Sequence, residues 1–403
     1  MNIVVLGGAA HMAQPAVKYL VEKEEINNIV LADLHFSKVE KIANRLGSKV
    51  QPQAVDVNKR EQLANTIKGA DLVLNFIGPY FKFGTKILET VIDAGIHYID
   101  ICDDHDTTLE ALALNERAIE KGVTALIGMG ASPGITNVLA RLASDELDHV
   151  EEINTYWLVG KSELGGFGAM IHMFHIIDGK VPIFKDGELQ YIPAFRKESS
   201  RTIDFGELVG EVTLYPVGHP EPVTLSQSIR GVKTVTNYGG LLPDYLNSLY
   251  KTLVDFGLTS EESIFFRNEK VSPLEFLLAY FQHKQEKNPS YFSVGKKPLG
   301  ASRIEVIGVK NGERASYTFT KAGHYTMANS TSLPTAVAAY LMLKGEITEK
   351  GVIPPESINP KKILLPLKDT EFFSDARTFQ LKQKLGNQTF SAQLFDTELF
   401  DEI

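Results

Sequence analysis

The most constraining feature of this sequence is a regular alternation over residues 1 to about 135, in which short apolar runs are followed by a turn and a stretch of helical periodicity. The runs predict buried strands at Ile3–Leu6, Asn28–Leu31, Lys49–Val55, Leu72–Ile77, Tyr98–Ile101 and Thr124–Ile127. Helices are expected between them at Gln14–Glu24, Ser37–Leu46, Arg60–Ile67, Gly84–Ala94 and Thr107–Lys121. Parallel neighbours need helical crossovers, so the alternation predicts an α/β fold with a doubly wound parallel sheet.

The rhythm changes after about residue 148. Further strands are expected at Glu152–Val159, Glu211–Tyr215, Pro222–Ser228, Ser302–Val309 and Arg314–Thr320, several of them without a helix between. Helices are expected at Leu242–Phe256, Pro273–Lys287 and Ala336–Lys344. Neighbouring strands without crossovers predict a second domain of α+β type on a mostly antiparallel sheet.

Composition narrows the classes of partner. The 403 residues are 43% hydrophobic and 23% charged, which suits a folded chain with more than one core. With 41 basic and 50 acidic residues the formal charge is −9, which argues against nucleic acid as a partner. One cysteine, Cys102, allows no disulfide within the chain. The absence of a basic leader and of an apolar run of membrane-spanning length predicts a cytoplasmic protein without a membrane partner.

The first strand runs into Gly7-Gly8-Ala9-Ala10-His11-Met12-Ala13. Aligned on Gly8, this is a degenerate dinucleotide fingerprint in which Ala10 and Ala13 take the places of the second and third glycines. Small side chains allow the backbone to approach a pyrophosphate, and the following helix offers amide donors. We therefore expect cofactor contacts from Gly8, Ala9, Ala10, His11, Met12 and Ala13. The alternative is an ordinary strand-to-helix turn.

An acidic residue ends the second strand. Asp33 lies 25 positions after Gly8, where a carboxylate can accept both adenosine ribose hydroxyls. It would repel a 2′-phosphate, and no arginine follows directly, so NAD is predicted over NADP; a helix cap is the alternative. At the end of the third strand, Asp56 with Val57 faces the adenine or caps the helix that follows Lys59.

The fourth strand closes with Asn75-Phe76-Ile77-Gly78-Pro79-Tyr80, at the sheet edge where open α/β folds bind ligands. We expect Asn75, Gly78 and Pro79 to contact the nicotinamide end of the cofactor and Tyr80 to contact the substrate. A turn without a ligand is the alternative.

Several motifs in the same order resemble the saccharopine dehydrogenase family, over roughly residues 1 to 360. They are Gly78-Pro79-Tyr80, Tyr98-Ile99-Asp100, Pro133-Gly134-Ile135-Thr136-Asn137, Gly218-His219-Pro220-Glu221-Pro222-Val223-Thr224, Thr236-Asn237-Tyr238-Gly239-Gly240, and Leu333-Pro334 with Gly351-Val352. The resemblance implies a nicotinamide-binding Rossmann domain, an inserted domain over an amino-acid substrate, and hydride exchange at a carbon that bears nitrogen. It also implies a substrate pocket at the turn that holds Gly130, Pro133, Gly134 and Asn137. Ser132 departs from the acidic residue of saccharopine reductases and is closer to lysine 6-dehydrogenases.

These observations divide the chain into three parts. Residues 1–135 with about 325–360 are expected to form the Rossmann domain, and residues 136–324 an inserted substrate and dimerisation domain. The tail at 361–403 carries Phe372, Phe373, Phe379, Phe390, Phe395 and Phe400. So many phenylalanines predict that the tail docks on its own subunit or a neighbour. We expect a homodimer.

Oxidising an amine to an imine needs a proton acceptor, and histidine suits that role near neutral pH. His172 and His175 are three residues apart and share a face of a helix. They are candidates for proton transfer or for binding a carboxylate, with simple packing as the alternative, and no metal site is predicted because no third ligand is signalled nearby.

Charged residues supply the other candidates. Asp103 and Asp104 end the fifth strand and can hold a substrate ammonium, or belong to a solvated loop. Arg230, Arg201 and Arg303 are candidates for binding a substrate carboxylate, and Arg230 is our choice.

The sequence therefore predicts an NAD-dependent oxidoreductase that acts on the C–N bond of an amino acid or an opine-like secondary amine, through hydride transfer and imine hydrolysis. Two alternatives stay open. One is an NAD(P)H-dependent imine reductase of the carboxynorspermidine dehydrogenase type, and the other is a non-catalytic dinucleotide-binding regulatory protein.

Overall fold

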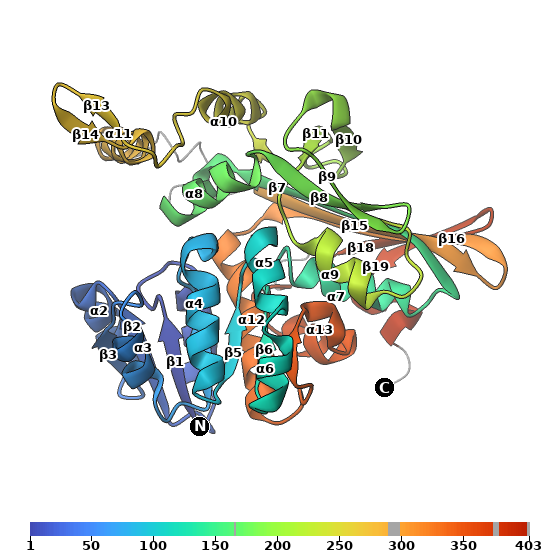
Figure 1. The fold of residues 1–403 in the computed structure, drawn as a ribbon. Coiled ribbons are helices and arrows are strands. Elements are labelled where there is room, and N and C mark those ends of the chain that lie inside the picture. Colours follow the sequence, from blue (N-terminus) through green and yellow to red (C-terminus); the bar gives the residue numbers. More distant parts are fainter. Residues whose placement is uncertain (165–166, 289–298, 374–378, 401–403) are drawn as a thin grey trace.

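The structure is a computed structural model that describes residues 1–164, 167–288, 299–373 and 379–400. Figure 1 shows a Rossmann-type unit in its lower part and a second sheet above it. Within the described ranges, no helix is long and apolar enough to cross a membrane.

The lower unit is built on parallel strands. Among the described residues, the sheet has seven strands in the order β17-β6-β5-β4-β1-β2-β3. They are β1 (Asn2–Leu6), β2 (Asn28–Asp33), β3 (Val50–Ala54), β4 (Leu72–Asn75), β5 (His97–Asp100), β6 (Thr124–Leu126) and β17 (Gly351–Ile353). The order of the first six strands is that of dinucleotide-binding folds, and the predicted fold class is confirmed.

Helices cover both faces of this sheet because its strands are apolar on both sides. Ile3 and Val5 of β1 pack in the core under one set of helices, whereas Val4 and Leu6 pack in the core under the other. The first set is α1 (Ala13–Val21), α2 (Phe36–Leu46), α7 (Ile135–Ser144), α12 (Met327–Leu343) and α13 (Pro360–Lys368). The second set is α3 (Arg60–Ile67), α4 (Tyr80–Asp93), α5 (His105–Leu112) and α6 (Asn115–Glu120).

The second sheet lies over the first unit. Its path among the described residues is β10-β11-β12-β7-β15-β16-β18-β19, with β8 and β9 attached to β12. The strands are β7 (His149–Gly160), β8 (Lys180–Lys185), β9 (Glu188–Pro193), β10 (Arg201–Asp204), β11 (Glu211–Pro216), β12 (Thr234–Leu242), β15 (Leu299–Lys310), β16 (Glu313–His324), β18 (Gln380–Leu385) and β19 (Gln388–Gln393). The predicted mostly antiparallel sheet is confirmed, with β7 and β12 as a parallel pair.

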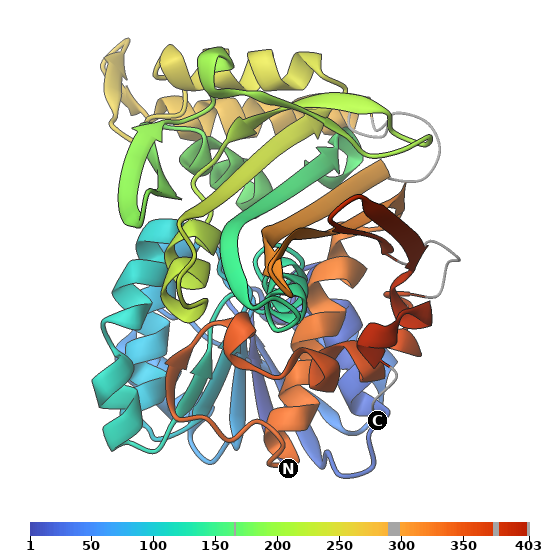
Figure 2. The same cartoon turned by 90° about the vertical axis from the view of Figure 1, so that its right-hand side faces the viewer.

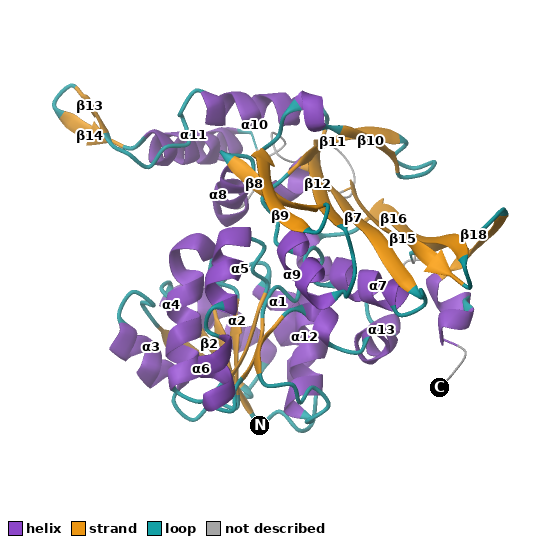
Figure 3. Ribbon diagram, turned by 45° about the vertical axis from the view of Figure 1, so that its right-hand side comes forward, coloured by secondary structure: helices purple, strands orange, loops and turns teal. Residues whose placement is uncertain are grey.

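Helices of the second domain lie on its upper side and at the junction. They are α8 (Phe167–Ile176), α9 (Glu221–Ser228), α10 (Tyr245–Asp255) and α11 (Pro273–Lys287), and the hairpin β13 (Ile264–Phe266) with β14 (Glu269–Val271) extends from the α10–α11 region. In Figure 3, α8 and α9 lie between the two sheets.

Two expectations need correction. Pro222–Ser228 is not a strand but part of α9, where Pro222 lies in the first helical turn, a position that tolerates its missing amide hydrogen. The tail is not a separate part, because β18 pairs with β16 and extends the second sheet. Figure 2 shows these dark red strands beside the orange β15–β16 hairpin. The tail therefore docks on its own subunit, which was one of the two predicted alternatives, the other being a neighbouring subunit.

Candidate active site

The turn after β1 has the shape that a dinucleotide requires. Gly7 has φ +75°, and a Cβ there would lie 2.9 Å from the carbonyl carbon of Phe76. A Cβ on Gly8 would lie 2.9 Å from Cβ of Leu31. Gly7 thus supplies the tight turn that we expected of Gly8, whereas Gly8 allows close packing on β2. Ala9, Ala10, His11 and Met12 follow in the turn, and Ala13 begins α1, whose first amides lack side-chain caps and suit a phosphate.

Asp33 lies beside this turn. Its Oδ2 accepts a hydrogen bond from the amide of Ala9 at 3.1 Å, and its Oδ1 accepts one from the amide of His35 at 2.9 Å. The carboxylate is therefore next to the predicted cofactor loop, as the ribose position requires, and it also stabilises that loop.

Asp56 stabilises the turn before α3 but does not cap that helix, whose N-cap Lys59 has no side-chain hydrogen bond. The predicted contact of Asp56 with the adenine stays a prediction. Its Oδ1 accepts hydrogen bonds from the amide of Asn58 at 3.1 Å and from the side chain of the same residue at 3.2 Å. Val57 is half-buried in the same turn. Neither residue has a contact that singles it out for the cofactor.

The end of β4 is tied to β5 by buried hydrogen bonds. Asn75 donates to the hydroxyl of Tyr98 at 2.9 Å, and the hydroxyl of Tyr80 donates to the backbone oxygen of Asn75 at 2.8 Å. The hydroxyl of Tyr80 is directed into the domain, and the predicted contact of Tyr80 with substrate stays a prediction. Asn75 supports the same edge, and the predicted cofactor contacts of Asn75, Gly78 and Pro79 stay predictions.

Asp100 continues this network at the end of β5. It accepts hydrogen bonds from the amides of Gly128 and Cys102 at 2.7 and 3.0 Å and from the hydroxyl of Tyr98 at 2.9 Å. Burial raises the pKa of Asp100 to about 6. Cys102 is buried, and burial raises the pKa of its thiol. These groups fix the sheet edge on which the site is built.

The turn after β6 is tightly folded. Gly134 has φ +124°, and a Cβ there would lie 1.9 Å from the backbone oxygen of Gly130, so only glycine fits. Pro133 is buried in the turn. Asn137 accepts from the amide of Gly134 at 3.3 Å and donates to Glu356 at 2.9 Å while fully buried. Its amide holds the turn, and its predicted substrate contact stays a prediction.

The structure brings His172 to the acidic end of β5. Its Nε2 lies 3.1 Å from Oδ2 of Asp103, and its Nδ1 lies 2.8 Å from Oδ1 of Asp104. Burial opposes a charge on the imidazole, but the two carboxylates outweigh it and raise the pKa of His172 to about 9. His172 is therefore protonated at neutral pH.

His175 forms a second pair one turn along α8. Its Nε2 lies 3.0 Å from Oδ2 of Asp106, and its ring stacks on Phe81 with centroids 4.1 Å apart. Burial lowers the pKa of His175, but the hydrogen bond to Asp106 outweighs this and raises it. The predicted grouping of His172, His175 and Asp103 is thus observed, on facing elements of the two domains.

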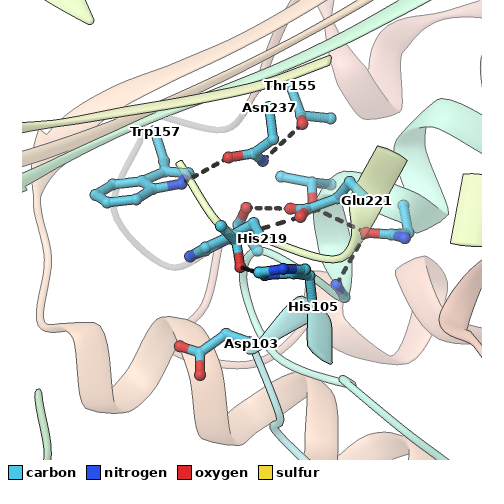
Figure 4. A network of polar contacts seen from close by, with 12 residues as sticks. Asp103, His105, Thr155, Trp157, His219, Glu221 and Asn237 are labelled. Atoms are coloured by element: carbon cyan, nitrogen blue, oxygen red, sulfur yellow. Dashed lines mark hydrogen bonds and ion pairs between the residues drawn. The ribbon is translucent and has the colours of Figure 1, made fainter. Parts of the chain in front are cut away.

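A third histidine, His219, was not predicted as a site residue. Its ring stacks on Trp157 with centroids 5.2 Å apart (Figure 4), and its centroid lies 5.6 Å from that of the His172 ring. Gly239 permits this arrangement, since a Cβ there would lie 2.1 Å from the Trp157 ring. The indole of Trp157 donates to Asn237 at 3.1 Å, which fixes its orientation.

Glu221 connects His219 to the Pro133 turn. This fully buried carboxylate accepts from the hydroxyl of Ser132 at 2.5 Å and lies 3.5 Å from Nδ1 of His219. Nδ1–H of His105 donates to the backbone oxygen of Gly218 at 2.9 Å. In the sequence, nothing marked Glu221 and His219 as site residues except their place in a family motif.

The candidate arginines lie elsewhere. Arg201 contacts Asn154 and Tyr156, on the face of the second sheet opposite Trp157, and Arg303 pairs with Glu305 on the same face as Tyr156. Arg230 is exposed after the last turn of α9, whereas Glu221 begins that helix. Our choice of Arg230 is not supported, because the length of α9 separates it from the cluster.

Two family models cover most of the chain. The saccharopine dehydrogenase NADP-binding domain matches residues 3–126, and the saccharopine dehydrogenase C-terminal domain matches residues 130–371. The chain belongs to the saccharopine dehydrogenase family.

Two curated relatives are similar along nearly their whole length. Carboxyaminopropylagmatine dehydrogenase of Synechocystis sp. is 24% identical, with 91% of this chain and 95% of the relative covered. Carboxynorspermidine synthase of Vibrio cholerae is 25% identical, with 90% and 94% covered. A solved structure of saccharopine dehydrogenase (L-Glu forming) from Saccharomyces cerevisiae shares the fold, with a TM-score of 0.69 at 16% identity over 95% of this chain and 99% of that one.

These findings confirm the predicted class of protein. This member of the saccharopine dehydrogenase family is an oxidoreductase that uses a nicotinamide cofactor and acts on a carbon–nitrogen bond. The loop from Gly7 to Ala13, with Asp33 beside it, fits such a cofactor through the tight turn at Gly7 and the small side chains that follow it.

Proposed function

We propose that the protein works in the reductive direction and turns an imine, formed from a short amino-acid aldehyde and a diamine or agmatine, into a carboxylated secondary amine. The names of the two relatives that match along nearly their whole length support this choice, because both refer to carboxylated polyamine-like products. This was the alternative in our sequence-based prediction, and lysine or saccharopine as substrate becomes the second candidate.

The observation that carries the proposal is the position of His172 between Asp103 and Asp104, with a carboxylate oxygen against each ring nitrogen, which favours the charged imidazolium. Reducing an imine adds a hydride to the carbon and a proton to the nitrogen, so the C=N double bond becomes a single bond. The reduced nicotinamide supplies the hydride when it is bound. His172 supplies the proton as a general acid, and the two carboxylates keep it charged until the transfer.

The charge of the site supports an amine substrate with further cationic groups. Asp103, Asp104 and Asp106 lie along one segment, and Glu221 lies beside His219 at the start of α9. The three candidate arginines of the second domain lie away from this cluster. A substrate with two or more ammonium or guanidinium groups therefore finds acidic partners here.

The oxidation of lysine or of saccharopine needs His172 to begin the reaction without its proton. A group must then accept a proton from the amine, and a histidine with its pKa raised to about 9 is already charged at neutral pH. The second candidate is thus favoured only in alkaline solution.

Among the two cofactors, we propose NAD(H) as the preferred form. Asp33 supports it, because a carboxylate beside the amide of Ala9 repels a 2′-phosphate at the ribose. Leu34, His35 and Phe36 follow without an arginine that would hold such a phosphate. The name of the matching family domain points to NADP instead, so the cofactor must be measured.

The deciding experiment measures both directions. Oxidation of NADH and of NADPH is followed with an amino-acid aldehyde plus a diamine or agmatine, and reduction of NAD and NADP is followed with lysine, ornithine and saccharopine. We expect the highest kcat/KM for an aldehyde–amine pair with NADH. Faster turnover of lysine or saccharopine at neutral pH would contradict the proposed direction. Binding of NADH without any turnover would instead support the non-catalytic alternative.

A further inference from the structure

We propose that Asp103, His172 and His219 form a binding site for a divalent metal ion of the zinc class. Each residue offers one ligand atom, and the three atoms all lie within 4.8 Å of one another. The three residues come from the end of β5, from α8 and from the segment before α9, so the site joins the two domains.

The spacing suits a tetrahedral ion. Zinc binds histidine nitrogen and carboxylate oxygen at about 2.0–2.2 Å, which places neighbouring ligand atoms of a tetrahedron roughly 3.3 Å apart. Nε2 of His172 and Oδ2 of Asp103 are 3.1 Å apart. Three protein ligands would leave a fourth position for water or a substrate atom.

Both histidines have the outer partners that metal ligands have. Nδ1 of His172 lies 2.8 Å from Asp104, and Nδ1 of His219 lies 3.5 Å from the buried Glu221. In each ring this leaves Nε2 as the nitrogen available to an ion. A carboxylate on the far nitrogen fixes the ring and makes the ligand nitrogen more basic, as in carboxylate–histidine–zinc arrangements.

Nδ1 of His219 is buried and poorly satisfied. The His219 side chain is 5% exposed, and among the described residues Nδ1 makes no hydrogen bond, with Glu221 at 3.5 Å as its ionic neighbour. Leaving a buried polar nitrogen without a partner costs free energy. A cation bound at Nε2, with Nδ1–H directed at Glu221, would give each nitrogen of the His219 ring a partner. The surrounding carboxylates Asp103, Asp104 and Glu221 also favour a positive ion.

The site was missed in the sequence because its ligands are far apart in the chain. We expected no metal there since His172 and His175 showed no third ligand nearby. His175 is paired with Asp106 instead, and the additional ligands come from Asp103 and His219.

For the enzyme, an ion at this site is an inhibitor, and this consequence rests on the proposed function. A metal on Nε2 of His172 occupies the atom from which the proton is donated. Zinc and imine substrate should therefore exclude each other, with inhibition that a chelator reverses.

The test measures binding without turnover. The full chain, freed of metal with a chelator, is titrated with Zn²⁺ against a chromophoric competitor and with Co²⁺, whose visible absorption reports tetrahedral nitrogen and oxygen ligands. We expect one ion per chain, at least about 100-fold weaker binding in His172→Ala and His219→Ala, and about 10- to 100-fold weaker binding in Glu221→Gln.

His175→Ala is the matched control, since it removes a histidine with a carboxylate partner from the same helix but outside the site. It should bind Zn²⁺ as the unchanged protein does. Absence of stoichiometric binding in the unchanged protein, or equal weakening in His175→Ala, would overturn the site. Circular dichroism confirms that each variant is folded. Because no cofactor or amine is present, failure here leaves the proposed function untouched, and failure of turnover leaves the metal site untouched.

Discussion

His172 is the residue that we propose as the general acid of this site. Its pKa is raised to about 9, so the charged form is present below that pH and is lost as pH rises through it. A general acid is active only in its protonated form. We predict that the reductive kcat/KM stays level through neutral pH and falls as pH rises through about 9, measured as initial rates of NADH oxidation.

Substitution tests the same residue. His172→Gln keeps a polar side chain but cannot carry the proton, so we expect a loss of about 100-fold or more in kcat and no fall near pH 9. His175→Ala should lose less, because Asp106 and Phe81 hold it beside the cluster. If both variants kept full activity, the proton would come from elsewhere, and Asp103 would be the next candidate.

Asp33 is the residue that we propose to favour NAD(H) over NADP(H). Removing one negative charge close to a 2′-phosphate is worth about 1.4 kcal/mol, or about tenfold in an equilibrium constant. We predict that Asp33→Asn raises kcat/KM for NADPH relative to NADH by about tenfold or more. Asp56→Asn, at the end of the next strand, should leave the ratio unchanged, and an unchanged ratio in Asp33→Asn would refute the assignment.

At the scale of elements, the turn between β6 and α7 depends on one glycine. A Cβ on Gly134 would lie 1.9 Å from the backbone oxygen of Gly130, in addition to the cost of its positive φ. We predict that Gly134→Ala lowers the free energy of unfolding by more than about 3 kcal/mol. Denaturant titration measures this loss.

Gly122→Ala is the control that measures the cost of a positive φ without a steric clash. Gly122 has φ +65°, but a Cβ there meets nothing within 4 Å. The control should therefore cost only about 1–2 kcal/mol, the usual penalty of a left-handed residue. Equal losses in the two variants would show that the contact with Gly130 relaxes freely.

The elements of the first domain could be predicted because their signals are local. Each strand is an apolar run with a turn at its end, and β1 to β6 lie close to the expected ranges. Pro222–Ser228 failed because a short apolar run does not distinguish a buried strand from a buried helix. Tertiary contacts decide whether this segment forms a helix or a strand, since it packs at the junction of the two domains.

The prediction of the site residues has the same limit, because only local patterns can be detected in the sequence. His172 and His175 were found because they share a helix face, and Asp103 because it ends a strand. His219 and Glu221 lie in a segment where no periodic pattern points to the site, and they reach it only through the arrangement of β7, β12 and α9. Asn137 and Tyr80 show a further limit, since a polar side chain near a sheet edge can be a buried support as well as a ligand contact.

At the scale of the whole molecule, the two sheets share one core. Residues of β1, α7, α12, β15 and β16 belong to a single buried cluster that Phe372, Phe373 and Phe379 of the tail also join. The acid end of β5 and the histidines of the second domain therefore face each other across a packed junction. This arrangement explains why the site needs both domains.

The predicted homodimer has a candidate interface on the α10–α11 arm, which comprises α10, the β13–β14 hairpin and α11. Phe265 of the β13–β14 hairpin is 74% exposed, and Ile264, Phe266, Phe256 and Phe276 are exposed around it. Such a patch marks a docking surface in a soluble protein. The hairpin also carries Arg267 and Lys270 beside Glu269, a mixture of charges that suits contact with a second copy of the same surface.

We predict that the protein is a dimer in solution and that the double substitution Phe265→Ser with Phe266→Ser makes it a monomer, as measured by light scattering after size-exclusion chromatography. Folding of the single chain should be little affected, because both side chains are exposed within it. Phe390→Ser is the control, since Phe390 is 57% exposed on β19 in the C-terminal part of the second sheet. A monomeric unchanged protein, or a dimer that survives the double substitution, would rule out this arm as the interface.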